Sequence, residues 1–186
     1  MLKEISVRAE REMKKAIEAT VKGFNGIRTG RASLALLDGL MVEAYDSPPV
    51  PINQVASLAV PETRLITVQP WDTSLLPAIE KAILKSDLGV TPTNDGKLIR
   101  IPIPSLTEER RKELVKVVRK VAEEGRVAVR NARRDANESL KRKEREKEAS
   151  EDEVKKGQDM IQVVTNRLTK EIDELLAKKE KEIMEF

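Results

Sequence analysis

The sequence of 186 residues contains no cysteine and no histidine. Their absence excludes disulfides, zinc or haem ligation by these side chains, and every mechanism that needs a cysteine or histidine nucleophile or base. Aromatic residues make up only 2% of the chain, and no run approaches the ~18 consecutive apolar residues of a membrane-spanning helix. Among the remaining carboxylates, lysines and hydroxyls, no glycine-rich phosphate loop or paired-carboxylate motif stands out. We therefore expect a protein that is not an enzyme and has no cofactor or metal.

Charge, in contrast, is abundant, with 36% charged residues against 39% hydrophobic residues and a formal net charge of +3. Glu4 and Glu10 fall within the first ten residues, which lack an apolar segment, so no signal peptide is expected. Residues 31–104 carry 14 charges, whereas the other 112 residues carry 53. All nine prolines lie between Pro48 and Pro104. We expect a cytoplasmic protein that does not associate with membranes and that contains a separate domain at 31–104.

The rest of the chain predicts three long amphipathic helices, because its apolar residues recur at steps of three or four. The predicted helices run from Leu2 to about Ile27, from Thr107 to Ala149, and from a capping box at Ser150–Glu153 to about Ile183. Each helix has one apolar stripe, which it can bury against the other two in a bundle. The predicted fold class is α+β. Residues 1–29 and 106–186 form a long three-helix bundle, and a small α+β domain at 31–104 is inserted between the first two helices.

The inserted segment predicts a small β-rich domain with one helix. Alternating or β-branched runs predict four strands, at Leu40–Tyr45, Val55–Val60, Leu65–Gln69 and Leu98–Ile103. The spacing of apolar residues predicts a helix between Ser74 and Asp87, with Gly89 as a stop. Pro102 lacks an N–H for strand pairing, so we expect its strand at an edge of the sheet.

Trp71 and Tyr45 are the largest aromatic residues of the insert. On a surface they could form a stacking platform for bases. The insert has no basic cluster around them, however, and carries six Lys and Arg against eight Asp and Glu. We therefore expect both rings in core or edge packing. The bundle segments carry 29 Lys and Arg against 24 Asp and Glu, so any nucleic-acid contact is expected there.

Two short links join the insert to the helices, one at residues 29–31 and one at 104–106. Gly30 can take the left-handed conformation that is common at the C-terminal end of a helix. Two short links permit a hinge, because few residues need to change conformation to move one part against the other. The candidate hinge residues are Thr29, Gly30, Pro104 and Ser105.

The second predicted helix contains an arginine segment, residues 126–134, with four cations and no anion. Its cations are Arg126, Arg130, Arg133 and Arg134. At ~100° per residue they fall within an arc of roughly 100°, away from the apolar stripe, so all four are expected to point into solvent. Such charges commonly form a solvated face, and Glu123, Glu124 and Asp135 can pair with some of them. The exclusive use of arginine, whose planar fork suits phosphates, favours phosphate binding.

The same helix carries two further features. Asn131 and Asn137 could hydrogen-bond to sugars or base edges, although asparagines on a surface more often do nothing specific. A stripe of small residues accompanies them, formed by Gly125, Ala128, Ala132 and Ala136. We interpret this stripe as a place of close helix packing and not as a binding site.

Four segments together resemble the signatures of the ribosome recycling factor family. These segments are Arg28–Ser33 (RTGRAS), Ser86–Gly89 (SDLG), Leu106–Lys112 (LTEERRK) and Val127–Arg134 (VAVRNARR). The resemblance covers essentially the whole chain, in order and at family length. One departure is the turn at Ala44–Asp46, where relatives commonly have a Tyr-Tyr-Gly-like sequence.

The resemblance implies an L-shaped molecule of tRNA-like dimensions, with the three-helix bundle as one arm and the β-rich domain as the other. It implies a monomeric translation factor without catalytic residues, which binds the post-termination ribosome. With elongation factor G and the GTP hydrolysed by that factor, it would split the ribosome into subunits. The expected contact is the 23S-type rRNA of the large subunit. By position, the expected rRNA contacts are Arg130, Arg133 and Arg134, with Arg126 and Asn131 beside them and Arg28 and Arg31 near the hinge.

Two alternatives fit the sequence less well. One is a helical scaffold whose charged helices bind protein partners through pairs of opposite charge. The other is a small hydrolase, which the missing nucleophile–base pairs disfavour. Sedimentation with large subunits at low and high salt separates the scaffold from an RNA-binding factor, because phosphate binding weakens steeply with salt.

Overall fold

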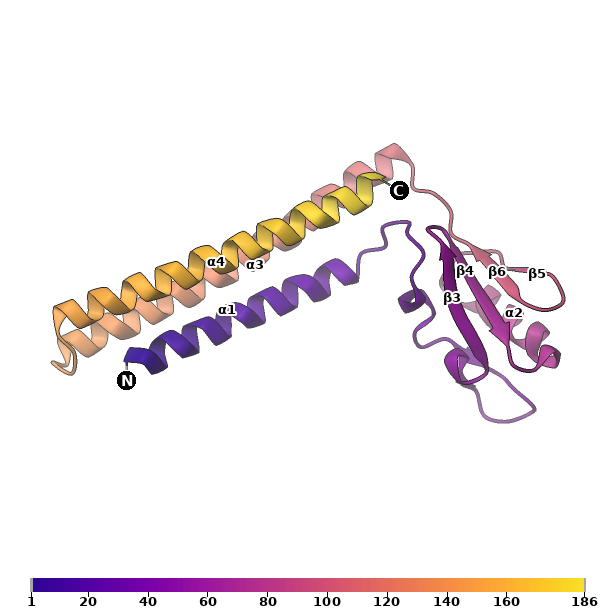
Figure 1. The fold of residues 1–186 in the computed structure, drawn as a ribbon, viewed down its shortest axis with the longest axis horizontal. Coiled ribbons are helices and arrows are strands. Elements are labelled where there is room, and N and C mark those ends of the chain that lie inside the picture. Colours follow the sequence, from indigo (N-terminus) through magenta and orange to yellow (C-terminus); the bar gives the residue numbers. More distant parts are fainter. Residues whose placement is uncertain (1, 186) are drawn as a thin grey trace. The chain divides into compact units, whose positions relative to one another are not determined.

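The computed structural model describes residues 2–185, which form two compact units (Figure 1). The first unit contains three helices, namely α1 (Leu2–Asn25), α3 (Glu108–Arg145) and α4 (Glu151–Glu185). The second unit is Thr29–Thr107, so the chain leaves the first unit after α1 and returns to it at α3. Both divisions adjoin the links expected from the sequence. Within the described residues, no helix combines the length and the apolar character needed to cross a membrane.

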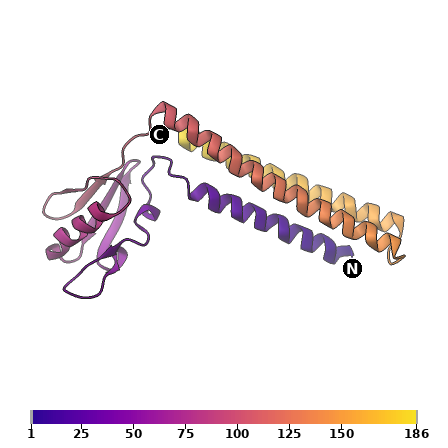
Figure 2. The same ribbon diagram turned by 180° about the vertical axis from the view of Figure 1, so that it is seen from behind.

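The helices of the first unit pack lengthwise, and each contacts the other two. α3 and α4 form a hairpin, and α1 runs along them (Figures 1 and 2). The three apolar stripes meet in a core, as the periodicity predicts. Its fully buried members include Met13 from α1, Val118, Val129 and Leu140 from α3, and Ile161, Ile172 and Ile183 from α4.

The start of each C-terminal helix agrees with its sequence signal. α3 begins at Glu108, one residue after the predicted start at Thr107. At the start of α4, the backbone N–H of Glu153 donates to Oγ of Ser150 at 3.3 Å, and the backbone N–H of Ser150 donates to Oε2 of Glu153 at 2.9 Å. These reciprocal bonds confirm the capping box, which satisfies backbone donors that the helix itself leaves unpaired.

The end of α1 differs slightly from the expectation. The helix ends at Asn25, two residues before Ile27, and the N–H of Gly26 donates to the carbonyl of Lys22 at 3.1 Å. Gly30 does adopt the left-handed conformation, with φ of +77°. It lies five residues beyond the helix, however, and therefore shapes the link instead of capping the helix.

The second unit is built on a four-stranded antiparallel sheet in the order β3-β4-β6-β5. Its strands are β3 (Ala56–Glu62), β4 (Leu65–Pro70), β5 (Thr93–Asn94) and β6 (Ile99–Pro102), and a separate small sheet pairs β1 (Met41–Val42) with β2 (Val50–Pro51). α2 (Leu76–Lys85) covers one face of the larger sheet (Figures 1 and 2). There, Ile79 and Ile83 of α2 share a core with Ile66 of β4 and Ile101 of β6.

The strands of the second unit differ from the sequence prediction in two respects. β2 and β5 have only two residues each, too few to show an alternating pattern. The expectation that Pro102 lies on an edge strand is wrong, because β6 is placed between β4 and β5. β5 pairs only with Ile99 and Arg100, so Pro102 has a strand partner, Leu65, on one side alone. Its missing N–H therefore costs no bond to β5.

The large aromatic residues of the second unit lie on its surface, contrary to the expectation of core or edge packing. Tyr45 is 65% exposed and Trp71 is 69% exposed. The hydroxyl of Tyr45 donates a hydrogen bond to the carboxylate of Asp72, and this bond raises the pKa of Tyr45 above its ordinary value. The tyrosine ring is thus tethered at its tip while its faces stay accessible.

Tyr45 lies in a tight turn within the loop between β1 and β2. The N–H of Ser47 donates to the carbonyl of Ala44 at 3.0 Å, and the two central residues, Tyr45 and Asp46, have φ of +53° and +52°. Positive φ at both central positions is usually supplied by glycine or asparagine. A tight turn is therefore present at Ala44–Asp46, where the sequence departs from the family pattern.

The small-residue stripe of α3 is a close-packing surface along only part of its length. Gly125 and Ala136 are buried in the bundle, which confirms the interpretation there. Ala128 is exposed and Ala132 is half-buried, and both line an open groove between α1 and α3. The prediction of close helix packing is therefore wrong for Ala128. Ala132 is only partly covered, because it lies beside this groove.

Candidate nucleic-acid interface

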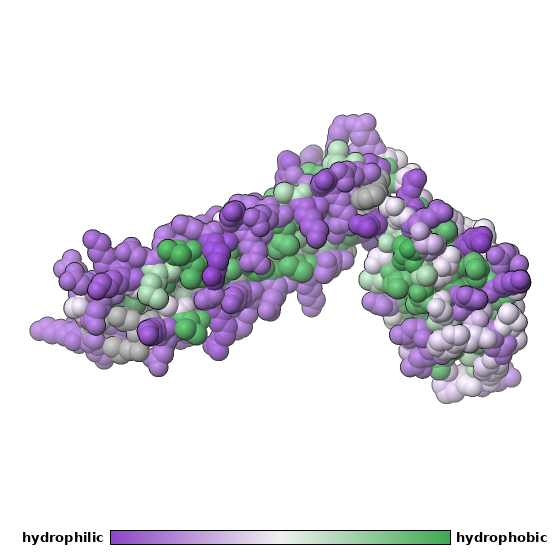
Figure 3. All heavy atoms as spheres, in the orientation of Figure 1, coloured by the Kyte–Doolittle hydropathy of each residue, from purple (hydrophilic) through white to green (hydrophobic). Residues whose placement is uncertain are grey.

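The arginine segment lies in the middle of α3, where buried residues fix the rotation of the helix. Val129 is fully buried and Gly125 is packed in the core. Because successive positions are about 100° apart, Arg130 and Arg134 then project outward. The visible surface of the bundle is largely hydrophilic, as its composition requires (Figure 3).

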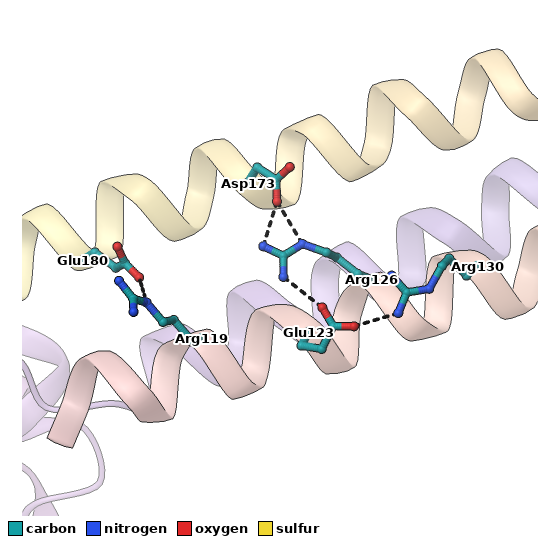
Figure 4. Close-up of polar contacts among 6 residues, drawn as sticks. All are labelled: Arg119, Glu123, Arg126, Arg130, Asp173 and Glu180. Atoms are coloured by element: carbon teal, nitrogen blue, oxygen red, sulfur yellow. Dashed lines mark hydrogen bonds and ion pairs between the residues drawn. The ribbon is translucent and has the colours of Figure 1, made fainter. Parts of the chain in front are cut away.

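Arg126 does not point freely into solvent, contrary to the expectation. Its side chain is only 22% exposed. Its Nε donates to Oδ1 of Asp173 on α4 at 2.9 Å, and its Nη1 donates to Oε2 of Glu123 at 3.0 Å (Figure 4). The bond to Asp173 raises the pKa of Arg126 further, so the guanidinium stays charged. Arg126 therefore connects α3 to α4.

Arg130 shares the carboxylate of Glu123 with Arg126. Its Nη2 donates to Oε1 of Glu123 at 2.7 Å, and its side chain is 48% exposed (Figure 4). Hydrogen bonds from Arg130 and Arg126 hold the pKa of Glu123 below its ordinary value, so this carboxylate is ionised at neutral pH. Only one nitrogen of Arg130 is engaged among the described residues, which leaves Nε and Nη1 as donors.

The two following arginines differ in how firmly they are held. Nη1 of Arg133 donates to Oε1 of Gln162 on α4 at 3.2 Å, and Gln162 in turn donates to Asn166 at 2.7 Å. Arg134 is 74% exposed, and its ion pair with Asp135 is long, at 3.9 Å. We call Arg130, Arg133 and Arg134 the arginine face. It presents three cations on one side of α3, each with guanidinium nitrogens that make no hydrogen bond among the described residues.

The remaining expected RNA contacts lie in different surroundings. Asn131 is exposed and lines the groove between α1 and α3. Asn137 is half-buried, and its side-chain oxygen has no hydrogen-bond partner in the described part of the chain. Arg28 is exposed just beyond α1, whereas the exposed Arg31 belongs to the second unit. The structure thus places Asn131 and Asn137 on the same helix as the arginine segment, and Arg28 and Arg31 outside that helix.

The four candidate hinge residues all lie in the second unit, outside helices and strands. Thr29 is buried and Gly30 half-buried, whereas Pro104 and Ser105 are exposed. A Cβ added to Gly30 would lie 2.9 Å from Cγ of Leu106. The outgoing and returning links therefore run side by side at this point.

The residues of α4 that hold the arginines have no signal in the sequence. Asp173 and Gln162 are far along the chain from Arg126 and Arg133, and only helix packing brings them together. Glu123 gave a local signal, because it precedes Arg126 by three residues and therefore lies on the same face of α3.

The comparison with known families decides what this bundle and its insert belong to. The family model described as Ribosome recycling factor matches residues 20–184, which include the arginine face and both links. The chain belongs to the ribosome recycling factor family. The resemblance of its four sequence segments to this family is thereby confirmed, as is the predicted function in ribosome recycling.

Individual ribosome recycling factors match over the full length. The factor of Syntrophomonas wolfei is 58% identical over 185 residues, and that of Desulfatibacillum aliphaticivorans is 55% identical over 186 residues. Each alignment covers 100% of this chain and 100% of the relative. The names of these relatives support neither of the two alternatives, the helical scaffold and the small hydrolase.

Known structures of ribosome recycling factors have the same fold. A solution structure aligns with a TM-score of 0.74 and 46% identity, covering 100% of this chain and 98% of that chain. A T. thermophilus ribosome recycling factor, described with E. coli elongation factor G bound to the E. coli post-termination complex, aligns with a TM-score of 0.63 and 48% identity over 98% of both chains. These neighbours confirm the predicted α+β class, with long helices and a small antiparallel domain.

Proposed function

We propose that this protein binds the post-termination ribosome through the rRNA of the large subunit and, with elongation factor G, splits the ribosome into subunits. Membership of the ribosome recycling factor family supports this function. Similarity to the T. thermophilus factor described with elongation factor G and a post-termination complex supports the partners. The protein acts in the cytoplasm as a monomer and uses no catalytic residue or cofactor of its own.

The single observation that carries the rRNA assignment is the arginine face. Arg130, Arg133 and Arg134 present guanidinium donors from one side of a rigid helix, and no two of them are tied to the same carboxylate. A guanidinium offers two parallel N–H donors to a phosphate, so this face matches the backbone of RNA. Asn131, which is exposed one residue after Arg130, adds a neutral donor and acceptor beside the cations.

Binding to isolated large ribosomal subunits at several salt concentrations tests this proposal. Each phosphate contact that is removed should flatten the fall of log affinity with log salt by roughly 0.7–0.9. Replacing Arg130 and Arg133 together by alanine should therefore weaken binding and reduce its dependence on salt. Lysine at these positions should restore the slope but only part of the affinity, because it supplies charge without the planar pair of donors.

Arg119→Ala is the matched control, because Arg119 lies on the same helix but pairs with Glu180 of α4 (Figure 4). It should bind like the parent. If the double alanine variant of Arg130 and Arg133 binds as tightly as the parent at physiological salt, the arginine face is a solvated surface and does not bind RNA. Subunit splitting with elongation factor G and GTP should fail in the double variant, and excess protein should partly restore it if affinity alone is reduced.

We also propose that Thr29, Gly30, Pro104 and Ser105 form a hinge on which the second unit moves during splitting. The positive φ of Gly30 and the 2.9 Å between a Cβ added there and Cγ of Leu106 support this, because a side chain there would both strain the backbone and press on the returning link. Gly30→Val should reduce splitting while leaving the melting of the helical bundle unchanged.

Gly89→Val supplies the control for backbone strain, because Gly89 also has positive φ but a Cβ there would meet nothing within 4 Å. It should affect splitting less than Gly30→Val. Residual dipolar couplings that fit one fixed orientation of the two units, free and on the ribosome, would contradict the hinge.

A further inference from the structure

A continuous series of charged contacts runs from α4 to the arginine face. Oδ1 of Asp173 accepts from Nε of Arg126 at 2.9 Å and lies 2.7 Å from its Nη2. Nη1 of Arg126 reaches Oε2 of Glu123 at 3.0 Å, and Nη2 of Arg130 reaches Oε1 of Glu123 at 2.7 Å (Figure 4). Each oxygen of Glu123 thus receives one guanidinium, and the series ends at Arg130.

The inner part of this series is fixed in place. Arg126 uses Nε and both Nη atoms, and its side chain is mostly covered. A guanidinium held at three points has little rotational freedom, and it holds Glu123 by one of its two oxygens. The other oxygen is then presented at a defined position, where it meets Arg130.

Arg130 is held at one nitrogen and open at the rest. A free arginine side chain has many rotamers, and ordering such a side chain upon binding costs affinity. The contact with Glu123 already restricts the rotamers of Arg130 in the free protein, so less conformational entropy is lost when RNA binds. Arg133 is held similarly from α4 by Gln162, whereas among the described residues Arg134 has only its long pair with Asp135.

A carboxylate next to a phosphate site also has an opposing effect, because its charge repels phosphate. Salt weakens that repulsion only in part, since the Debye length is about 8 Å at physiological ionic strength and a phosphate bound to Arg130 would be nearer to Glu123 than that. The hydrogen-bond geometry at Arg130 is a short-range effect that salt screens less. The two effects oppose each other at Arg130, and we expect the loss of the held geometry to exceed the gain from reduced repulsion when Glu123 is neutralised.

We propose that Glu123 is a positioning residue for RNA binding. Held by Arg126 and, through it, by Asp173 of α4, its carboxylate fixes the guanidinium of Arg130 so that Nε and Nη1 face an RNA phosphate. This role rests on the proposed function of the arginine face. It assigns to two acidic residues a positive contribution to the binding of a polyanion.

The decisive experiment compares Glu123→Gln with Glu124→Gln in binding to isolated large ribosomal subunits at physiological salt. Both variants remove one negative charge from adjacent positions of α3. Glu124 is exposed and has no hydrogen bond or ion pair among the described residues, so it reports the effect of charge alone. Glu123→Gln should weaken binding about two- to ten-fold, as expected for freeing one rotamer-rich side chain. Glu124→Gln should bind as tightly as the parent or slightly more tightly.

Two further variants keep the test specific to Arg130. Asp173→Asn should weaken binding in the same direction as Glu123→Gln, and less strongly, because it acts through Arg126. In an Arg130→Ala background neither change should weaken binding further, although a purely structural loss would still add. Melting temperatures of all variants show whether any loss of binding is a loss of folded protein.

The outcomes separate the positioning role from the proposed function. If Glu123→Gln binds as tightly as Glu124→Gln or more tightly, while Arg130→Ala binds weakly, Arg130 contacts RNA but Glu123 does not position it. If Arg130→Ala binds like the parent, the contact of Arg130 itself is wrong, and the positioning role is overturned with it. Weakening by Glu123→Gln that persists in the Arg130→Ala background would also overturn the proposal.

Discussion

Gly125 of α3 faces Thr20 of α1 with no room for a methyl group between them, because a Cβ on Gly125 would overlap the hydroxyl oxygen of Thr20. The same Cβ would lie 3.4 Å from Cδ1 of Ile172 on α4. The hydroxyl of Thr20 cannot easily turn away, since it donates to the carbonyl of Ala16 at 2.8 Å. All three helices of the bundle therefore meet at this glycine.

Gly125→Ala should destabilise the bundle by about 1–3 kcal/mol through overpacking. Alanine favours a helix interior over glycine by about 1 kcal/mol, so a loss of stability would be opposite to the effect of propensity. Urea unfolding of the variant measures the change. The loss should largely disappear in a Thr20→Ala background, and strictly additive effects of the two substitutions would show that the contact does not limit packing.

Ala132→Leu should be tolerated better than Gly125→Ala. A tightly packed stripe would predict a loss of about 1–3 kcal/mol at both positions. Ala132 is half-buried beside the open groove between α1 and α3, so a leucine can extend along the groove. We expect a change of less than about 1 kcal/mol. Arg133→Ala should have a similarly small effect in the same unfolding assay, and an equal loss for Ala132→Leu and Gly125→Ala would contradict the observed rotation of α3.

Ser150→Ala should destabilise the bundle by about 1 kcal/mol, because it removes the side chain that caps α4. Ser139→Ala is the matched control, since Ser139 lies inside α3 and, within residues 2–185, its hydroxyl bonds only to the carbonyl of Asp135. Alanine is favourable in a helix interior, so the control should be neutral or slightly stabilising. Thermal melts should therefore show a lower melting temperature for Ser150→Ala, and an unchanged or slightly higher one for Ser139→Ala.

Glu153→Gln should lower the stability at neutral pH, and this difference from the parent should shrink in acid. The backbone N–H and hydroxyl of Ser150 hold the pKa of Glu153 below its ordinary value of 4.5. A carboxyl whose pKa is lowered on folding stabilises the protein above its unfolded pKa, and this stabilisation is lost as the pH falls through the folded pKa. Melting temperatures from pH 7 to pH 3 measure it, with Glu151→Gln as the control. A gap that is constant with pH would contradict the capping role of the charge.

Asp46→Gly should stabilise the second unit by up to about 1 kcal/mol. Asp46 has φ of +52°, where an ordinary residue is strained and glycine is not. Asp38→Gly is the control, because Asp38 has φ of −61° and the same substitution there only adds flexibility to the unfolded chain. Thermal unfolding should move in opposite directions for the two variants.

Features that depend on neighbours along the chain could be predicted from the sequence. The apolar stripes gave the three helices, and the serine and glutamate of the capping box gave the start of α4, because spacing in a helix directly determines which residues share a face. The same reasoning placed Arg130 and Arg134 outside the core. The insert was recognisable because charge and proline content change abruptly at its ends.

Features that depend on contacts between distant segments could not be predicted. From its position on the helix, Arg126 is expected to be exposed. Its low exposure results from packing against α4, where it bonds to Asp173. Tyr45 and Trp71 were expected in core or edge packing, yet the core of the second unit is filled by aliphatic residues and leaves both rings outside. Their exposure follows from the whole packing of the unit and has no local signature.

The side-by-side links at Gly30 and Leu106 also bear on how the chain folds. Thr20 and Gly125 can meet only after the intervening chain has been closed into a loop, and the entropy lost in closing a loop grows with its length. Once the second unit has folded, its two ends are already adjacent, and α1 reaches α3 as if a short connection joined them. Folding of the second unit should therefore shorten the loop that must close before α1 packs on α3, and we expect that weakening the core of this unit slows the assembly of the bundle.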